Sequence, residues 1–129
     1  MLRLLAAVFI GSGIGGVIRF LISYYLSPRF STKSLWTMFP WPTFTVNILG
    51  CFLIGLIFGL IDSGSVHISD QTKTFLTAGL CGGLTTFSTF THENYLLFQS
   101  HNFPLLALYT ISSLVIGFAA AHFANTLTA

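Results

Sequence analysis

The residues best suited to chemistry in this chain lie in one stretch, from Gly79 to Glu93. Three glycines fall within its first five positions, and each weakens a helix by about 1 kcal/mol relative to alanine. Five hydroxyl residues fall within the seven positions that begin at Thr85. An interrupted helix presents carbonyl groups to a hard cation and amide groups to an anion. The stretch therefore predicts an interrupted helix that handles ions.

Donor side chains accompany the predicted break. Phe87 and Phe90 are three residues apart and share a helix face, and the edges of their rings carry partial positive charge. An alternative is that the glycines serve close packing and that the hydroxyl groups bond back to their own helix. The hydroxyl donors are Thr85, Thr86, Ser88 and Thr89.

Polar residues in other segments are candidates for the same pathway. Asn47 carries two amide donors that are costly to leave unpaired in hydrocarbon, so it needs a polar partner or a pore. Tyr109, Ser113 and Gly117 recur at four-residue steps and so lie on one helix face. That face is either an anion track or a set of contacts between helices.

Arg19 and Glu93 are the charged candidates. A basic residue at the centre of a membrane span costs about 3 kcal/mol on insertion scales, so we expect Arg19 toward the end of its span. It either attracts anions or anchors to lipid or a loop carboxylate. Glu93 either lines a vestibule or lies at the membrane interface.

Other chemistry has weaker support. Ser88 and His92 are four residues apart and could pair as nucleophile and base, but no oxyanion-hole residues accompany them. The remaining histidines suggest no metal site, and Cys51 and Cys81 are expected to be small buried side chains. Those histidines are His67, His101 and His122.

The elements that must position these residues are membrane spans. The chain has 129 residues, of which 53% are hydrophobic and 6% charged, whereas soluble domains are about a quarter charged. We therefore expect an all-α membrane protein with one four-span domain, residues 1–129, and an uncleaved first span. The expected spans are about 4–26, 43–61, 75–98 and 103–127.

Basic residues divide evenly between the two expected sides of the membrane. Arg3 and Lys73 fall on one side, and Arg29 and Lys33 fall on the other. Because Lys and Arg set orientation, this balance is compatible with insertion in both directions and with an antiparallel homodimer. Small residues four apart would mediate packing within one subunit or between copies. These pairs are Gly11 with Gly15, Ser12 with Gly16, Gly55 with Gly59, and Gly79 with Gly83.

The chain resembles the Fluc (CrcB-type) fluoride channels in three motifs. These are Gly-Ser-Gly-Ile-Gly-Gly-Val-Ile-Arg at 11–19, Thr-Val-Asn at 45–47, and Gly-Leu-Cys-Gly-Gly-Leu-Thr-Thr-Phe-Ser-Thr-Phe at 79–90. The third motif is highly specific, and the likeness covers nearly the whole chain. Ser12 stands where a glycine is more usual.

The resemblance implies an antiparallel dual-topology homodimer with two fluoride pores. It implies a structural sodium ion at the dimer centre, held by the backbone carbonyls of Gly82 and Thr85. It assigns Arg19 to the first-helix arginine and Glu93 to the acidic residue beyond the phenylalanines. The residues it assigns to the fluoride pore are Asn47, Phe87, Phe90, Ser88, Thr89, Tyr109 and Ser113.

The resulting prediction is passive fluoride export across the bacterial inner membrane. The expected partners are fluoride, the lipid bilayer and a second copy of the chain, with no nucleic acid and no enzymatic activity. One alternative is a small four-span, dual-topology multidrug or guanidinium exporter. That class needs a carboxylate within the first span, and residues 4–26 contain none. An intramembrane hydrolase is the third class considered.

Overall fold

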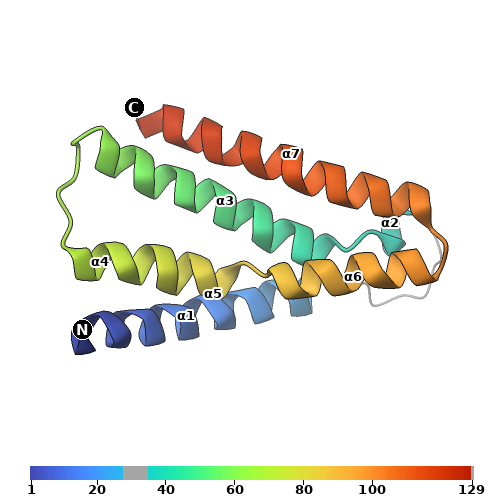
Figure 1. Cartoon of the computed structure of the whole chain (residues 1–129), viewed down its shortest axis with the longest axis horizontal. Helices are drawn as coiled ribbons and strands as arrows, with labels where there is room; N and C mark the ends of the chain where they lie inside the picture. Colours follow the sequence, from blue (N-terminus) through green and yellow to red (C-terminus); the bar gives the residue numbers. More distant parts are fainter. Residues whose placement is uncertain (28–34, 129) are drawn as a thin grey trace.

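The computed structural model describes residues 1–27 and 35–128, and every regular element within these ranges is helical (Figure 1). The elements, in chain order, are α1 (Leu2–Leu26), α2 (Leu35–Met38), α3 (Trp41–Asp62), α4 (Asp70–Thr74), the π-helix η1 (Phe75–Cys81), α5 (Gly82–Leu84), α6 (Phe87–Gln99) and α7 (Phe103–Thr128).

The helices pair in two layers along a common long axis. α3 packs along α7, and α1 packs along the segment formed by α4, η1 and α5. Figure 1 shows both termini at one end of the molecule, together with the loop between α3 and α4. The turn between α6 and α7 lies at the opposite end.

Local signals set several helix ends. Pro42 lies in the first turn of α3, where its missing N–H costs nothing. The hydroxyl of Ser69 caps α4 by accepting a bond from the Thr72 amide at 3.2 Å. His101 adopts a φ of 56° in the turn before α7, and this left-handed conformation reverses the chain.

Glycines bring α1 and η1 into close contact. A Cβ added at Gly11 would lie 2.7 Å from the Phe75 carbonyl oxygen and 2.8 Å from the Gly79 Cα. Gly55 makes an equally close approach to Ala121 between α3 and α7. Gly16 is an exception, because no atom from another part of the chain lies within 4 Å of the position its Cβ would take. The predicted packing role within one subunit is therefore confirmed for most of these small residues.

Among the described residues, three helices are long and apolar enough to cross a membrane: α1, α3 and α7. The expected span 75–98 is a composite segment instead, because a break after Leu84 separates η1 and α5 from α6. The predicted interruption between Gly79 and Glu93 is therefore present. Arg29 and Lys33, which entered the charge count, lie outside the described residues.

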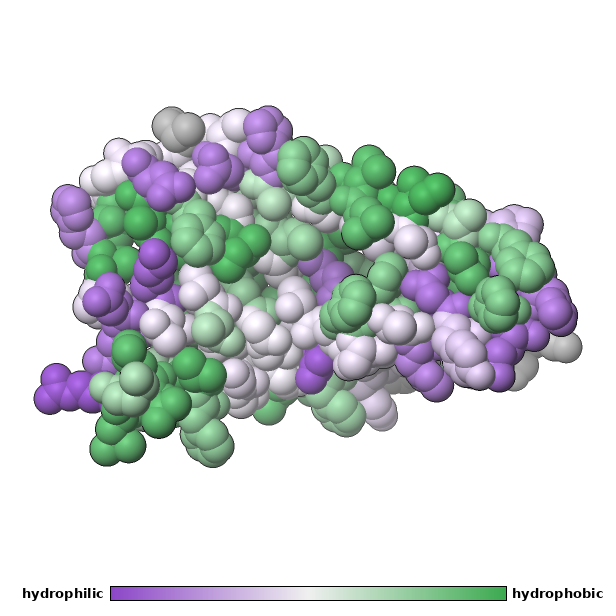
Figure 2. All heavy atoms as spheres, in the orientation of Figure 1, coloured by the Kyte–Doolittle hydropathy of each residue, from purple (hydrophilic) through white to green (hydrophobic). Residues whose placement is uncertain are grey.

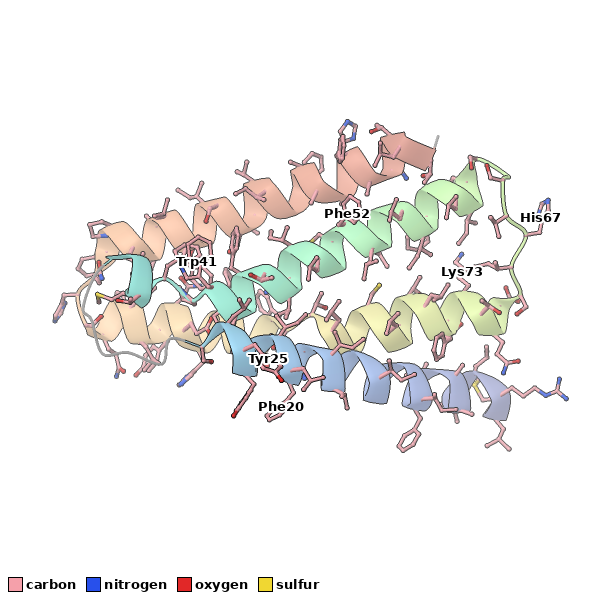
Figure 3. The ribbon with its side chains drawn as sticks, turned by 180° about the vertical axis from the view of Figure 1, so that it is seen from behind. Phe20, Tyr25, Trp41, Phe52, His67 and Lys73 are labelled. Atoms are coloured by element: carbon pink, nitrogen blue, oxygen red, sulfur yellow. The ribbon has the colours of Figure 1, made fainter. Side chains whose placement is uncertain are left out.

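The outer surface is largely apolar. Phe9, Phe20 and Phe118 are exposed, and Figure 3 shows Phe20 and Tyr25 pointing away from the other helices. On the face drawn in Figure 2, hydrophilic residues are most frequent toward the two ends of the long axis. An apolar flank between polar ends is the surface that a bilayer requires.

Candidate functional site

The site is built around two residues that leave the helical path. Thr85 has φ −84° and ψ 159°, and Thr86 has φ −149° and ψ 117°, so both are extended. α5 ends just before them at Leu84, and α6 begins just after them at Phe87. The Thr85 amide still donates to the Cys81 carbonyl at 3.0 Å, but the Thr86 amide and carbonyl have no helical partner among the described residues, so another group must satisfy them.

Asn47 of α3 supplies those partners. The Thr86 amide donates to Asn47 Oδ1 at 2.8 Å, and Asn47 Nδ2 donates to the Thr86 carbonyl at 3.2 Å. A primary amide can make this pair of bonds because it carries both an acceptor and donors. Of the two options that the sequence left open for Asn47, the structure provides the polar partner.

Thr86 also starts α6. Its hydroxyl oxygen accepts from the Thr89 amide at 3.3 Å, and its hydroxyl bonds the Thr89 side chain at 3.0 Å. The Ser88 hydroxyl lies 3.4 Å from the same Thr86 oxygen. Thr86 is therefore the N-cap residue of α6. Its side chain is buried, whereas those of Ser88 and Thr89 are exposed.

The Thr85 side chain faces α3. Its hydroxyl donates to the Cys81 carbonyl at 2.9 Å, and its methyl group occupies the place where a Cβ of Gly50 would stand. Arg19 Nη1 donates to the Thr85 carbonyl at 3.5 Å. Arg19 therefore contacts the break itself.

Gly82 lies one turn before the break, and its backbone is exposed. Among the described residues, no hydrogen bond other than those within helices reaches its carbonyl oxygen. The Gly82 and Thr85 carbonyls stand at the carboxyl end of α5, where the helix dipole is negative. This donor set suits a hard cation such as sodium.

Aromatic rings follow the break along α6. The ring centroids of Phe87 and Phe90 are 6.0 Å apart, and those of Phe90 and Tyr109 are 5.1 Å apart. Phe87 is 79% exposed, whereas Tyr109 is fully buried. The aromatic series therefore leads from the molecular surface into the core.

Glu93 is bound by two hydroxyl groups. Thr43 donates to its Oε1 at 2.7 Å, and Tyr109 donates to its Oε2 at 2.6 Å. The Thr43 and Tyr109 side chains are both buried. Both carboxylate oxygens of Glu93 are therefore bonded to buried residues of other helices, and its predicted role at a vestibule stays a prediction.

A cavity of about 400 Å³ joins most of the predicted residues. The buried hydroxyl oxygen of Ser113 has no hydrogen-bond partner among the described residues, and Ser113 lines this cavity. Ser88, Thr89, Tyr109, Arg19 and Glu93 do not line it. The predicted residues that do line it are Asn47, Gly82, Thr85, Phe87, Phe90 and Ser113.

The sequence interpretation missed two polar residues, Thr43 and Asn94. Thr43 precedes Asn47 by four positions, and this spacing could have placed both on one face of α3. Asn94 donates to the Phe90 carbonyl at 3.0 Å and accepts from the Thr110 hydroxyl at 2.9 Å. No local pattern singles out Asn94, because its α7 partner is distant in the sequence.

The hydrolase arrangement is absent from the described part of the chain. No hydrogen bond joins Ser88 to His92, and the His92 side chain is exposed. The cysteines are free thiols: Cys81 is buried, as predicted, and Cys51 is half-buried.

Comparison with known proteins identifies one family over most of the chain. The model of the family described as "CrcB-like protein, Camphor Resistance (CrcB)" matches residues 6–125. A relative from Phocaeicola vulgatus named "Fluoride-specific ion channel FluC" is 41% identical over 116 residues, 90% of each chain. A relative of the same name from Azobacteroides pseudotrichonymphae is 38% identical over 128 residues, which cover 99% of this chain and 98% of the relative.

Proposed function

The chain belongs to the CrcB-like family, and on that premise we propose that it is a fluoride-selective channel that lets fluoride leave the cell passively. The relatives' names supply the ion. The observation in this chain that carries the proposal is the cavity at the Thr85–Thr86 break, which unites a buried, unpaired hydroxyl with aromatic edges and an amide.

The chain is a multi-pass protein of the bacterial inner membrane, with α1, α3 and α7 as spans. In our proposal the composite of α4, η1, α5 and α6 is the fourth span. Broken helices are tolerated at membrane depth where the freed backbone groups are buried in protein or face a water-filled cavity. The two bonds from Asn47 to Thr86 meet that requirement.

The proposed anion path runs past Phe87 and Phe90 to Ser113. Fluoride is a compact, strongly hydrated acceptor, so a pathway must replace its water with hydroxyl, amide and aromatic-edge donors. None of the described residues that line the cavity carries a fixed positive charge. This suits conduction, which needs binding weak enough for the ion to leave. Asn47, Ser88 and Thr89 complete the proposed donor set, and Tyr109, whose hydroxyl proton goes to Glu93, borders the path through its ring beside Phe90.

A sodium ion is the proposed structural cation. The Gly82 carbonyl and the Thr85 carbonyl, which also accepts from Arg19 at 3.5 Å, would hold it, and its charge would balance the negative helix end. One copy offers two such carbonyls, and an antiparallel second copy would double that number. The fraction of dimer in detergent should therefore fall when sodium chloride is replaced by N-methylglucamine chloride. An unchanged fraction would remove sodium from the proposal.

The exporter alternative gains no support from the site. α1 contains no carboxylate, and Glu93 on α6 is already bound by Thr43 and Tyr109. An enzymatic role is likewise not proposed, because Ser88 bonds Thr86 rather than His92.

Fluoride tolerance tests the proposed function. A bacterial strain without its own fluoride exporters should grow in fluoride when it expresses this chain, and the Phe87→Ile variant should fail to support growth. Phe118→Ile is the matched control, because Phe118 is 76% exposed on α7 and lines none of the cavity. Tolerance to guanidinium but not to fluoride would favour the exporter instead.

A further inference from the structure

α6 carries both phenylalanines of the proposed path, and the buried Leu97 together with a few polar contacts holds it against the other helices. The two extended residues before it interrupt the helical hydrogen bonds, so α5 cannot fix its rotation. α6 makes fewer contacts with α7 than α3 does, and fewer still with α3. The rotation of α6 about its axis therefore depends on a small number of side contacts.

Two of these contacts are hydrogen bonds from neighbouring residues of α6 to neighbouring residues of α7. Glu93 accepts from Tyr109, and Asn94 accepts from the Thr110 hydroxyl at 2.9 Å. Neighbouring residues on a helix point about 100° apart. Glu93 also accepts from Thr43 of α3, so its position is held from two helices, and the Asn94–Thr110 bond adds a further attachment about 100° around α6.

Asn94 makes a second contact that leads toward the path. Its Nδ2 donates to the Phe90 carbonyl at 3.0 Å, one turn earlier on α6. The Asn94 amide therefore joins the backbone of Phe90 to the Thr110 side chain of α7. The side chain is partly buried, so losing either bond would leave a polar group poorly solvated.

From this geometry we propose that Asn94 is a positioning residue: it fixes the rotation of α6 against Thr110 and so aims Phe90 at the ion path. This inference rests on the proposed function, in which Phe90 faces the anion. Asn94 itself lies outside the cavity and touches no ion in this proposal.

The test compares matched variants of the full-length chain in liposomes. Asn94→Leu should slow fluoride efflux about tenfold, the factor expected for one hydrogen bond of ordinary strength. Gln99→Leu is the control, since this amide also bonds a residue one turn earlier on α6, the Tyr95 hydroxyl, and is exposed. It should stay within about twofold of the wild-type rate.

The α7 side of the bond gives a second arm that does not depend on Asn94→Leu folding well. Thr110→Val should slow efflux as Asn94→Leu does, and Thr110→Ser should restore it because the hydroxyl returns. The double variant Asn94→Leu/Thr110→Val should be no more than about twofold slower than Asn94→Leu alone, because Asn94→Leu already removes the bond to Thr110. Fully additive losses would overturn the proposal.

A spectroscopic signal distinguishes a changed orientation of the Phe90 ring from a loss of protein stability. With 4-fluorophenylalanine at position 90, the ¹⁹F resonance should shift in Asn94→Leu and stay in place in Gln99→Leu. Slow efflux with an unmoved resonance would contradict positioning. If Phe90→Ile conducts like the wild type, the proposed path itself fails. If Phe90→Ile is slow and Asn94→Leu is fast, only the present inference fails.

Discussion

Asn47 performs at the break the task that helical neighbours perform elsewhere. The backbone N–H and C=O of Thr86 both bond the side-chain amide of Asn47, which lies 39 residues earlier in the sequence. The extended conformation of Thr85 and Thr86 is therefore compensated by a specific partner. A substitution that keeps the shape of Asn47 and removes its donor should disturb the break directly.

Asn47→Asp is such a substitution. It replaces Nδ2 with an oxygen that would face the Thr86 carbonyl oxygen, so one bond becomes a repulsion. We expect fluoride efflux from liposomes to fall at least about tenfold, while the dimer persists on size exclusion. Asn102→Asp, in the turn before α7, is the control. If Asn47→Asp released fluoride at the wild-type rate, the Asn47 amide would not be needed for the proposed path.

Tyr109→Phe tests the bond to Glu93. The hydroxyl of Tyr109 is buried and donates to a carboxylate oxygen at 2.6 Å. Hydrogen bonds to charged groups contribute about 1.5–3 kcal/mol, so the unfolding free energy in detergent should fall by about that amount. Tyr95→Phe removes an exposed hydroxyl of the same type and should change stability by less than about 0.5 kcal/mol. Equal effects of the two variants would contradict the internal role of Glu93.

The sequence could indicate which side chains need partners, but it could not identify the partners. The amide of Asn47 within an apolar run required a bond, and that requirement followed from composition alone. Its partner Thr86, and the pairing of Thr43 with Glu93, depend on how α3 packs against the broken segment. Those contacts are set by tertiary structure, which no local pattern encodes.

Among the elements, the close contact between α1 and η1 depends on the absence of a side chain at Gly11. The neighbouring Gly13 faces open space, with no atom from another part of the chain within 4 Å of its would-be Cβ. The two glycines are two residues apart on one helix, so they form a matched pair.

Gly11→Ala should destabilise the protein by about 1–3 kcal/mol, because its Cβ would press on the backbone of Phe75 and Gly79. Gly13→Ala should be neutral or stabilising by up to about 1 kcal/mol through helix propensity. Thermal unfolding in detergent measures both. Comparable stability of the two variants would show that η1 does not need this close approach.

The position of the break shows how packing overrides propensity. The glycines suggested an interruption, yet Gly79, Gly82 and Gly83 all lie in helical segments, and the extended residues are Thr85 and Thr86. Gly79 and Gly83 allow the backbone to pack closely against α1, and the helix does not use their conformational flexibility to break. The break falls instead where a side chain from α3 can bond the backbone. The π-helix between Phe75 and Cys81 had no sequence signal that we recognised.

At the scale of the molecule, both termini and the loop between α3 and α4 share one end (Figure 1). In our proposal the composite segment is a fourth span beside α1, α3 and α7. We propose that two copies assemble in opposite orientations, so that copies in one orientation alone cannot form the channel.

Added charge tests the antiparallel assembly. Ser65→Arg with His67→Arg places two arginines at the terminal end, and Gln99→Arg with Ser100→Arg places two at the other end. Because basic loops remain on the cytoplasmic side, each pair should fix one orientation, opposite to that of the other pair. Either variant expressed alone should lose fluoride export, and coexpression should restore it. Full activity of either variant alone would exclude an obligate antiparallel dimer.

The central claim is that the chain passes fluoride selectively through the broken segment. Liposomes containing the purified protein and loaded with fluoride or with chloride, monitored with ion-selective electrodes, test it most directly. We predict rapid release of fluoride and no chloride release above that of protein-free liposomes, because chloride is larger and accepts weaker hydrogen bonds from these donors. Equal release of both ions, or retention of fluoride by well-folded protein, would contradict the account.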